Sequence, residues 1–135
     1  MEKEHLLTAA NCADGIHGGD CTFIASAPFP VRHLLACFDG TGGKIKPCGA
    51  SNLPIGTVTD EATTDDAVNV HFLGGNGTAL MVAAGAIARG AILAPAANGK
   101  VQVATSGLLR VGIAIGDAQG ADDRLEVLPF TPSGA

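Results

Sequence analysis

Two stretches of this 135-residue chain carry the same features in the same order. The matched features are the Gly-Lys pairs at 43–44 and 99–100, Gly56 and Gly112, and the Asp pairs Asp65-Asp66 and Asp122-Asp123. Features that recur in order at a nearly constant spacing indicate a duplicated supersecondary unit. We therefore expect a body of two similar units, repeat one at about 35–76 and repeat two at about 79–130.

Hydrophobic periodicity predicts that both units are built from β-strands. The clearest segments are 67–72 and 124–128, where alternation of period two places apolar side chains on one face. Gly, Asn and Asp separate such segments as turn residues. Only Ala79–Ala88 also fits a helix, and we favour a strand there because the segment lacks a clear cap beyond Thr78. The predicted strands are 32–38, 43–48, 55–59, 67–72, 78–84, 89–94, 100–104, 109–115 and 124–128.

The first 31 residues differ from the rest of the chain. They contain several Gly and Pro residues and no sustained periodicity, apart from a short apolar run at Cys21–Ser26. We expect an extended N-terminal arm and first strand at 1–31, in which residues 1–20 have weak intrinsic structure and are ordered by a neighbour. The β-rich body is expected at 32–135, so the fold class is mainly β with little helix.

Composition and charge exclude several classes of partner. Aromatic residues make up 4% of the chain, with no Trp or Tyr, which removes the usual anchors of a small-molecule pocket or a base-stacking surface. A net charge of −5 argues against nucleic acid, because phosphate binding needs clustered Lys and Arg. No apolar run approaches the length of a membrane span, and the N-terminal residues lack the pattern of a secretory signal. We expect a soluble protein made and used in a cytoplasm.

The doubled Asp pairs are the first candidate for acid–base or cation chemistry. Adjacent residues of a strand point to opposite faces, so the two carboxylates of a pair are badly placed to act together. An Asp just before a strand commonly accepts backbone N–H bonds in a turn. We therefore interpret Asp65, Asp66, Asp122 and Asp123 as turn residues. Glycines within strand patterns mark bulges or close approaches of backbone, which is our interpretation of Gly56 and Gly112.

Cysteine and histidine residues are the second candidate for chemistry. All four cysteines, Cys12, Cys21, Cys37 and Cys48, lie in the first 48 residues. Their spacings do not match the paired knuckles of structural zinc sites. We expect free thiols, as is usual in a cytoplasm. A local disulfide is an alternative, and so is an enzyme whose metal is held by Cys12, His17, Cys21 and either His33 or Cys37. No nucleotide-binding or hydrolase motif is present. We expect no catalytic residue, cofactor or metal.

The second copy carries a longer series of small and β-branched residues. The series is the run Ala83–Leu93, Asn98-Gly99-Lys100-Val101, Val111-Gly112-Ile113-Ala114, an acidic turn and Leu125-Glu126-Val127. This series resembles a family of tailed-bacteriophage capsid decoration (cement) proteins, which are rich in Ala and Gly and show the pattern in two related halves. The resemblance covers about 38–130 and is best in 79–128. The N-terminal stretch with its Cys and His residues departs from the family's pattern.

The resemblance implies a small β-barrel or tulip-like body and a structural function without enzymatic activity. It implies a homotrimer that decorates and stabilises the expanded phage capsid at three-fold capsomer junctions, on the outer surface of the virion, after assembly in the bacterial host cytoplasm. The partners would be the major capsid protein and further copies of the chain, with no nucleic acid or membrane. The arm then becomes the expected contact with the capsid and with adjacent subunits. Its expected apolar anchors are Leu6, Leu7, Phe23, Phe29 and Val31. A small β-barrel module that binds a glycan or another surface ligand is the alternative function.

Overall fold

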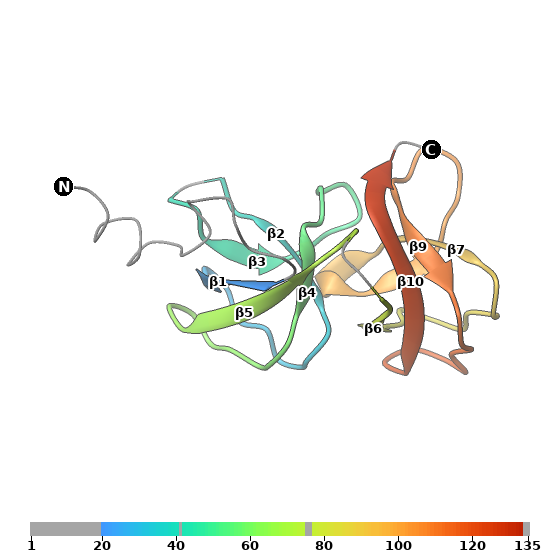
Figure 1. Cartoon of the computed structure of the whole chain (residues 1–135). Helices are drawn as coiled ribbons and strands as arrows, with labels where there is room; N and C mark the ends of the chain where they lie inside the picture. The colour runs from blue at the N-terminus through green and yellow to red at the C-terminus, as the bar shows by residue number, and fades with distance from the viewer. Residues whose placement is uncertain (1–19, 41, 75–76, 134–135) are drawn as a thin grey trace.

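The computed structural model describes residues 20–40, 42–74 and 77–133, which form two five-stranded antiparallel sheets (Figure 1). The first sheet contains β1 (Asp20–Ile24), β2 (Leu35–Phe38), β3 (Ile45–Pro47), β4 (Gly56–Val58) and β5 (Ala67–Phe72). The second contains β6 (Ala79–Val82), β7 (Ile92–Pro95), β8 (Val101–Val103), β9 (Arg110–Ala114) and β10 (Arg124–Ser133). We call residues 20–72 the first unit and 79–133 the second unit.

The two units have the same topology. The strand order is β1-β5-β4-β2-β3 in the first sheet and β6-β10-β9-β7-β8 in the second. Each sheet also has one isolated parallel bridge, Ala25 to Ile45 and Ala83 to Val101. The predicted mainly β fold with two similar units is confirmed. The sheets are open, however, so neither described unit is the closed barrel that the resemblance implies.

Each predicted strand segment overlaps an observed strand. The segment that also fitted a helix forms β6, as favoured, because its residues pair with β10. The strand β10 continues past the predicted end at 128 to Ser133, with an irregularity after Pro129. A short 3-10 turn, η1 (Ala97–Gly99), lies between β7 and β8. Among the described residues, no helix is long and apolar enough to cross a membrane.

The first unit begins earlier in the chain than expected. The strand β1 pairs with β5 along its whole length, from Asp20 opposite His71 to Ile24 opposite Ala67. Phe29 then forms an antiparallel bridge with Ala62, and Ile87 forms the same bridge with Ala118 in the second unit. Residues 20–31 therefore pack with the folded body, and β1 is a strand within the segment where the first strand was expected. Residues 1–19, where the arm was expected, lie outside the described residues.

The cores of the two units are shared at their boundary. One cluster fills the second unit and also contains Leu35, Cys37 and Cys48 of the first unit. The other fills the first unit and also contains Val82 of the second. Both faces of the chain at 34–37 are therefore buried, because Leu34 and Ala36 belong to one cluster while Leu35 and Cys37 belong to the other. Each of the two clusters therefore extends across the boundary between the units.

Candidate interaction surface

The expected apolar anchors fall in three different environments. Phe23 and Phe29 are 5% and 0% exposed and belong to the core of the first unit. They hold the sheet together and are not available to a partner, which corrects the expectation that they contact the capsid. Val31 is 37% exposed. Leu6 and Leu7 lie outside the described residues.

The Asp pairs lie in turns in both units. Asp65 and Asp122 take left-handed backbone conformations, with φ of 72° and 71°. Each carboxylate meets a lysine: Lys44 Nζ lies 3.4 Å from Asp65, and Lys100 Nζ lies 2.5 Å from Asp122. The second member of each pair accepts hydrogen bonds within the same turn. Asp66 accepts from the Thr63 backbone amide at 2.9 Å, and Asp123 accepts from the Gln119 amide at 2.8 Å.

The two matched glycines lie where neighbouring backbone leaves no room for a side chain. A Cβ placed on Gly56 would lie 2.2 Å from the carbonyl oxygen of His71. A Cβ placed on Gly112 would lie 2.6 Å from Val127 Cγ1 and 2.7 Å from the carbonyl oxygen of Leu128. Gly56 pairs with β5 and Gly112 pairs with β10 at the same place in each sheet. Both are close-approach positions at equivalent points of the repeat.

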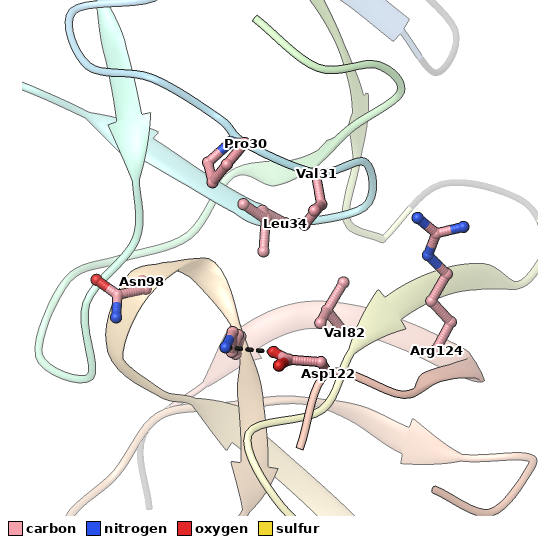
Figure 2. Close-up of a pocket in the computed structure, with 8 residues that line it drawn as sticks. Pro30, Val31, Leu34, Val82, Asn98, Asp122 and Arg124 are labelled. Atoms are coloured by element: carbon pink, nitrogen blue, oxygen red, sulfur yellow. Dashed lines mark ion pairs between the residues drawn. The ribbon is translucent and has the colours of Figure 1, made fainter. Parts of the chain in front are cut away.

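A groove lies between the units, with a volume of about 470 Å³ (Figure 2). One wall comes from the first unit and is apolar, with Pro30, Val31 and Leu34. Val82 and the polar residues Asn98, Lys100, Asp122 and Arg124 line the other side. The Lys100–Asp122 ion pair lies within the groove, so these two charges largely satisfy each other.

His33 precedes Leu34, which lines this groove, and its backbone takes an unusual conformation. Its φ is 70°, a left-handed value, at the position that Gly90 occupies in the second unit. Burial lowers the pKa of His33, and the positive charges of Arg124 and Arg32 lower it further. His33 is therefore kept neutral near neutral pH. Arg124 forms no ion pair with any described residue.

The cysteines divide into two kinds. Cys37 and Cys48 are free and buried against the second unit. Burial raises the pKa of both thiols, that of Cys48 to about 12, so neither is a nucleophile at neutral pH. Cys21 is disulfide-bonded. The expectation of four free thiols is therefore wrong for Cys21.

The outer face of the first sheet is polar. His71 Nδ1 lies 2.8 Å from Asp20 Oδ1, and this contact lowers the pKa of Asp20. Asn69 lies on the same face and contacts Asp20 and Thr59 at 3.3 Å. Toward β2 this face is covered, since Thr57 on β4 is 3% exposed and Leu35, its partner on β2, is 0% exposed.

The outer face of the second sheet carries exposed apolar side chains at several of the equivalent positions, beside the polar pair Thr78 and Glu126. Leu128 stands where His71 stands in the first sheet, and its neighbour Ile113 stands where Thr57 stands. Leu128 is 45% exposed, and Leu80 on the adjacent strand β6 is 43% exposed. Ile113 and its partner Ile92 are half-buried. Neighbouring exposed apolar side chains on a sheet face make it a candidate for contact with another macromolecule.

Sequence reasoning did not identify this face. The alternation at 124–128 showed that two sets of residues face opposite sides of β10, and both sets contain Leu. Which set meets the core depends on the pairing with β6 and β9. A usable signal was present, because Leu128 and Ile113 replace the polar His71 and Thr57 of the first copy.

Metal-ligating and catalytic groups do not converge in the parts of the chain that the structure describes. No group of three His, Cys, Asp or Glu side chains could hold a metal ion among residues 20–40, 42–74 and 77–133. His33, Cys21 and Cys37 of the proposed metal set therefore form no such group in the described residues. Cys12 and His17 lie outside them.

No protein-family model matches the sequence. No curated protein matches it at a significant level.

Proposed function

We propose that this chain is a structural protein of a phage virion. It decorates and stabilises the expanded capsid as a homotrimer at three-fold capsomer junctions, and its partner is the major capsid protein. The proposal grows from the resemblance of 38–130 to capsid decoration proteins, which implies a scaffold without enzymatic activity.

The positions of the resembling residues support this proposal. Val101, Val111 and Val127 are fully buried in the second unit. Asn98 and Gly99 take left-handed conformations, with φ of 62° and 78°, in the turn before β8. A pattern made of core and turn residues specifies a fold, as expected for a protein whose function is to be a rigid body on a surface.

The observation that carries the proposal is the exposed apolar face of the second sheet. Leu80 and Leu128 lie on strands that pair with each other, and Ile115, at the end of β9, is also exposed. Burying such side chains against another protein contributes about 25 cal/mol for each Å² removed from water. Three chains held together would present three such bodies, and joint attachment raises the effective affinity by about 10²–10⁴ over one contact.

Co-sedimentation with capsids tests this proposal. The purified chain is mixed with expanded and unexpanded shells of the phage that encodes it, both lacking the protein, and the bound fraction is measured. We expect saturable binding to expanded shells and none to unexpanded shells. Equal binding to both, or to neither, contradicts the proposal.

The contribution of the arm is tested in the same assay by deleting residues 1–19, which leaves Asp20 to pair with His71. Circular dichroism first shows that the shortened chain is folded. We expect shell binding to fall, and undiminished binding contradicts the role of Leu6 and Leu7. Among the anchors in the described residues, Val31 is the exposed one, and a Val31→Asp variant tests it. Leu53→Asp is the control, since Leu53 is also exposed.

The groove between the units favours the second candidate, a module that binds a glycan or another small ligand. Its volume of about 470 Å³ lies in the range of ligand sites. Its lining contains no aromatic ring to stack on a sugar. A glycan array probed with the labelled chain tests this candidate, and binding that Val82→Trp abolishes would support it over capsid decoration.

A further inference from the structure

The two units of one chain meet through a turn that docks on a strand. The turn contains Asn98 and Gly99 of the second unit, and the Gly99 amide donates to the carbonyl of Cys48 in the first unit at 2.7 Å. A Cβ placed on Gly99 would lie 2.9 Å from Leu34 Cβ and 2.9 Å from the Leu35 carbonyl oxygen. The docked turn therefore fits only without a side chain at this position.

The first unit contains the equivalent turn, and there the turn is not docked on another part of the described chain. Gly42 and Gly43 have φ of 64° and 73°, close to the 62° and 78° of Asn98 and Gly99. In both turns the next residue is a lysine paired with the Asp of left-handed conformation, Asp65 or Asp122. The first turn has one additional residue before the matched pair. No described atom lies within 4 Å of a Cβ placed on Gly43.

The second unit contains the equivalent of the surface on which the turn docks, which we call the receiving surface. There no turn of the described chain covers it. The Cys48 amide donates to the Leu35 carbonyl at 2.9 Å, and the Ala104 amide donates to the Ile92 carbonyl at 2.8 Å, so Ile92 and Ala104 are the equivalents of Leu35 and Cys48. Leu35 and Cys48 are fully buried under the second unit, whereas Ile92 and Ala104 are only half-buried. They line a hollow of about 400 Å³ together with Thr105, Ser106 and Arg110.

We propose that a second copy of this chain makes the same contact between molecules that the two units make within one chain. The Gly42-Gly43 turn of one copy docks on Ile92 and Ala104 of the next, and the Gly43 amide donates to the Ala104 carbonyl as Gly99 donates to Cys48 within the chain. A second copy is the fitting partner because the chain makes this contact once and contains a second donating turn and a second receiving surface. The apolar Ile113, in place of Thr57, extends the receiving surface.

Such a contact is head-to-tail, because the donating and receiving surfaces are different. A head-to-tail contact closes into a ring when its rotation allows, and otherwise forms a filament. Three copies in a ring would place six similar units around one axis. The inference goes beyond the proposed function, since it stands on the contact within the chain and does not depend on capsid binding.

Two variants remove the two sides of the contact. Gly43→Leu places a side chain where the docked turn has no room. Gly77→Leu is its control, because Gly77 has a similar φ of 86° and no described atom lies within 4 Å of its Cβ position. Ala104→Glu places a charge on the receiving surface. Val103→Glu is its control, because Val103 is exposed and points to the opposite face of the sheet.

Sedimentation equilibrium gives the mass of each species, after circular dichroism has shown that each variant is folded. We expect the wild-type chain and both controls to assemble, and each interface variant to weaken assembly by about tenfold or more, the effect of about 1.4 kcal/mol of overpacking or buried charge. An equimolar mixture of the Gly43→Leu and Ala104→Glu variants retains one intact donor and one intact receiver. We expect this mixture to form a species of two chains and no larger one.

Three results would overturn the proposal. They are a wild-type chain that is monomeric at all concentrations, interface variants that assemble as the wild type does, and a mixture of the two variants that stays monomeric. A chain that assembles as expected but does not bind expanded capsids would refute the proposed function and leave this inference intact.

Discussion

Gly99 donates its backbone amide to the carbonyl of Cys48 at 2.7 Å, which joins the turn before β8 to the end of β3. The equivalents of Gly99 and Cys48 in the other unit are Gly43 and Ala104. Gly43 has a similar left-handed φ of 73°, and the Ala104 amide donates to Ile92 as the Cys48 amide donates to Leu35. The duplicated chain thus makes one such contact internally. The donating turn of the first unit and the receiving surface of the second unit remain without this contact in the described chain.

The first prediction concerns the two glycines that approach backbone in the sheets. We expect Gly112→Ala to lower the free energy of unfolding by about 1–3 kcal/mol, because its Cβ would overlap Val127 and the Leu128 carbonyl. Gly85→Ala is the control, because no described atom lies within 4 Å of its Cβ position. Urea unfolding measures both. A Gly112→Ala variant as stable as the control would show that β9 and β10 do not approach as closely as described.

The second prediction separates core residues from surface residues in 20–31. We expect Phe29→Ala to cost about 3–5 kcal/mol of stability, because Phe29 is fully buried in the first unit. Val31→Ala should have little effect on stability, since Val31 is exposed. Denaturant unfolding of the two variants gives the comparison. Similar small effects at both positions would indicate that residues 20–31 belong to the arm and not to the folded body.

The third prediction is a pH dependence centred on the turn at 63–66. Hydrogen bonds from the amide and hydroxyl of Thr63 hold the pKa of Asp66 below its usual value. The stability that Asp66 contributes is therefore fully present above its unfolded pKa of about 4 and is lost as the pH falls through its folded pKa. We expect Asp66→Asn to reduce the fall in Tm between about pH 5 and pH 2.

Glu61→Gln serves as the control for this titration, because the exposed Glu61 carboxylate has no ion pair or hydrogen bond with the described residues. Its Tm should follow the wild-type curve. If Asp66→Asn and the wild type lose stability in parallel as the pH falls, the turn is not the source of the acid sensitivity.

The fourth prediction concerns the free thiols at the boundary between the units. Burial raises the pKa of Cys37 and of Cys48, so both should resist alkylation in the folded protein at pH 8. Both should react once guanidinium unfolds the chain. Peptide mass spectrometry after alkylation identifies the modified residues, and rapid modification of Cys48 in the folded protein would mean that the units separate.

Strand positions and the duplication were predictable from the sequence because they depend on local patterns. Alternation located β5 and β10, and the turn glycines separated the strands. The start of the first unit was missed because β1 and β6 share no identical residues, and Pro28 and Pro30 interrupt the periodicity after β1. Their equivalence is visible only in the pairing with β5 and β10.

The candidate surface was less predictable, because it depends on contacts between distant residues. Phe23 and Phe29 are large and apolar, and sequence alone does not distinguish a core residue from an anchor. Whether Leu128 or Val127 faces the interior depends on the register between β9 and β10. The burial of Leu35 and the exposure of Ile92 follow from how the units meet, which no local pattern encodes.

Stoichiometric binding to expanded capsids is the property that distinguishes a capsid decoration protein from other assembled β-rich proteins. Expanded and unexpanded shells lacking the protein are titrated with the purified chain, and the bound copies are counted after sedimentation. We expect saturation on expanded shells at three copies for each three-fold position and no binding to unexpanded shells. Expanded shells that sediment without the protein, at concentrations where the chain is folded and assembled, would contradict this expectation.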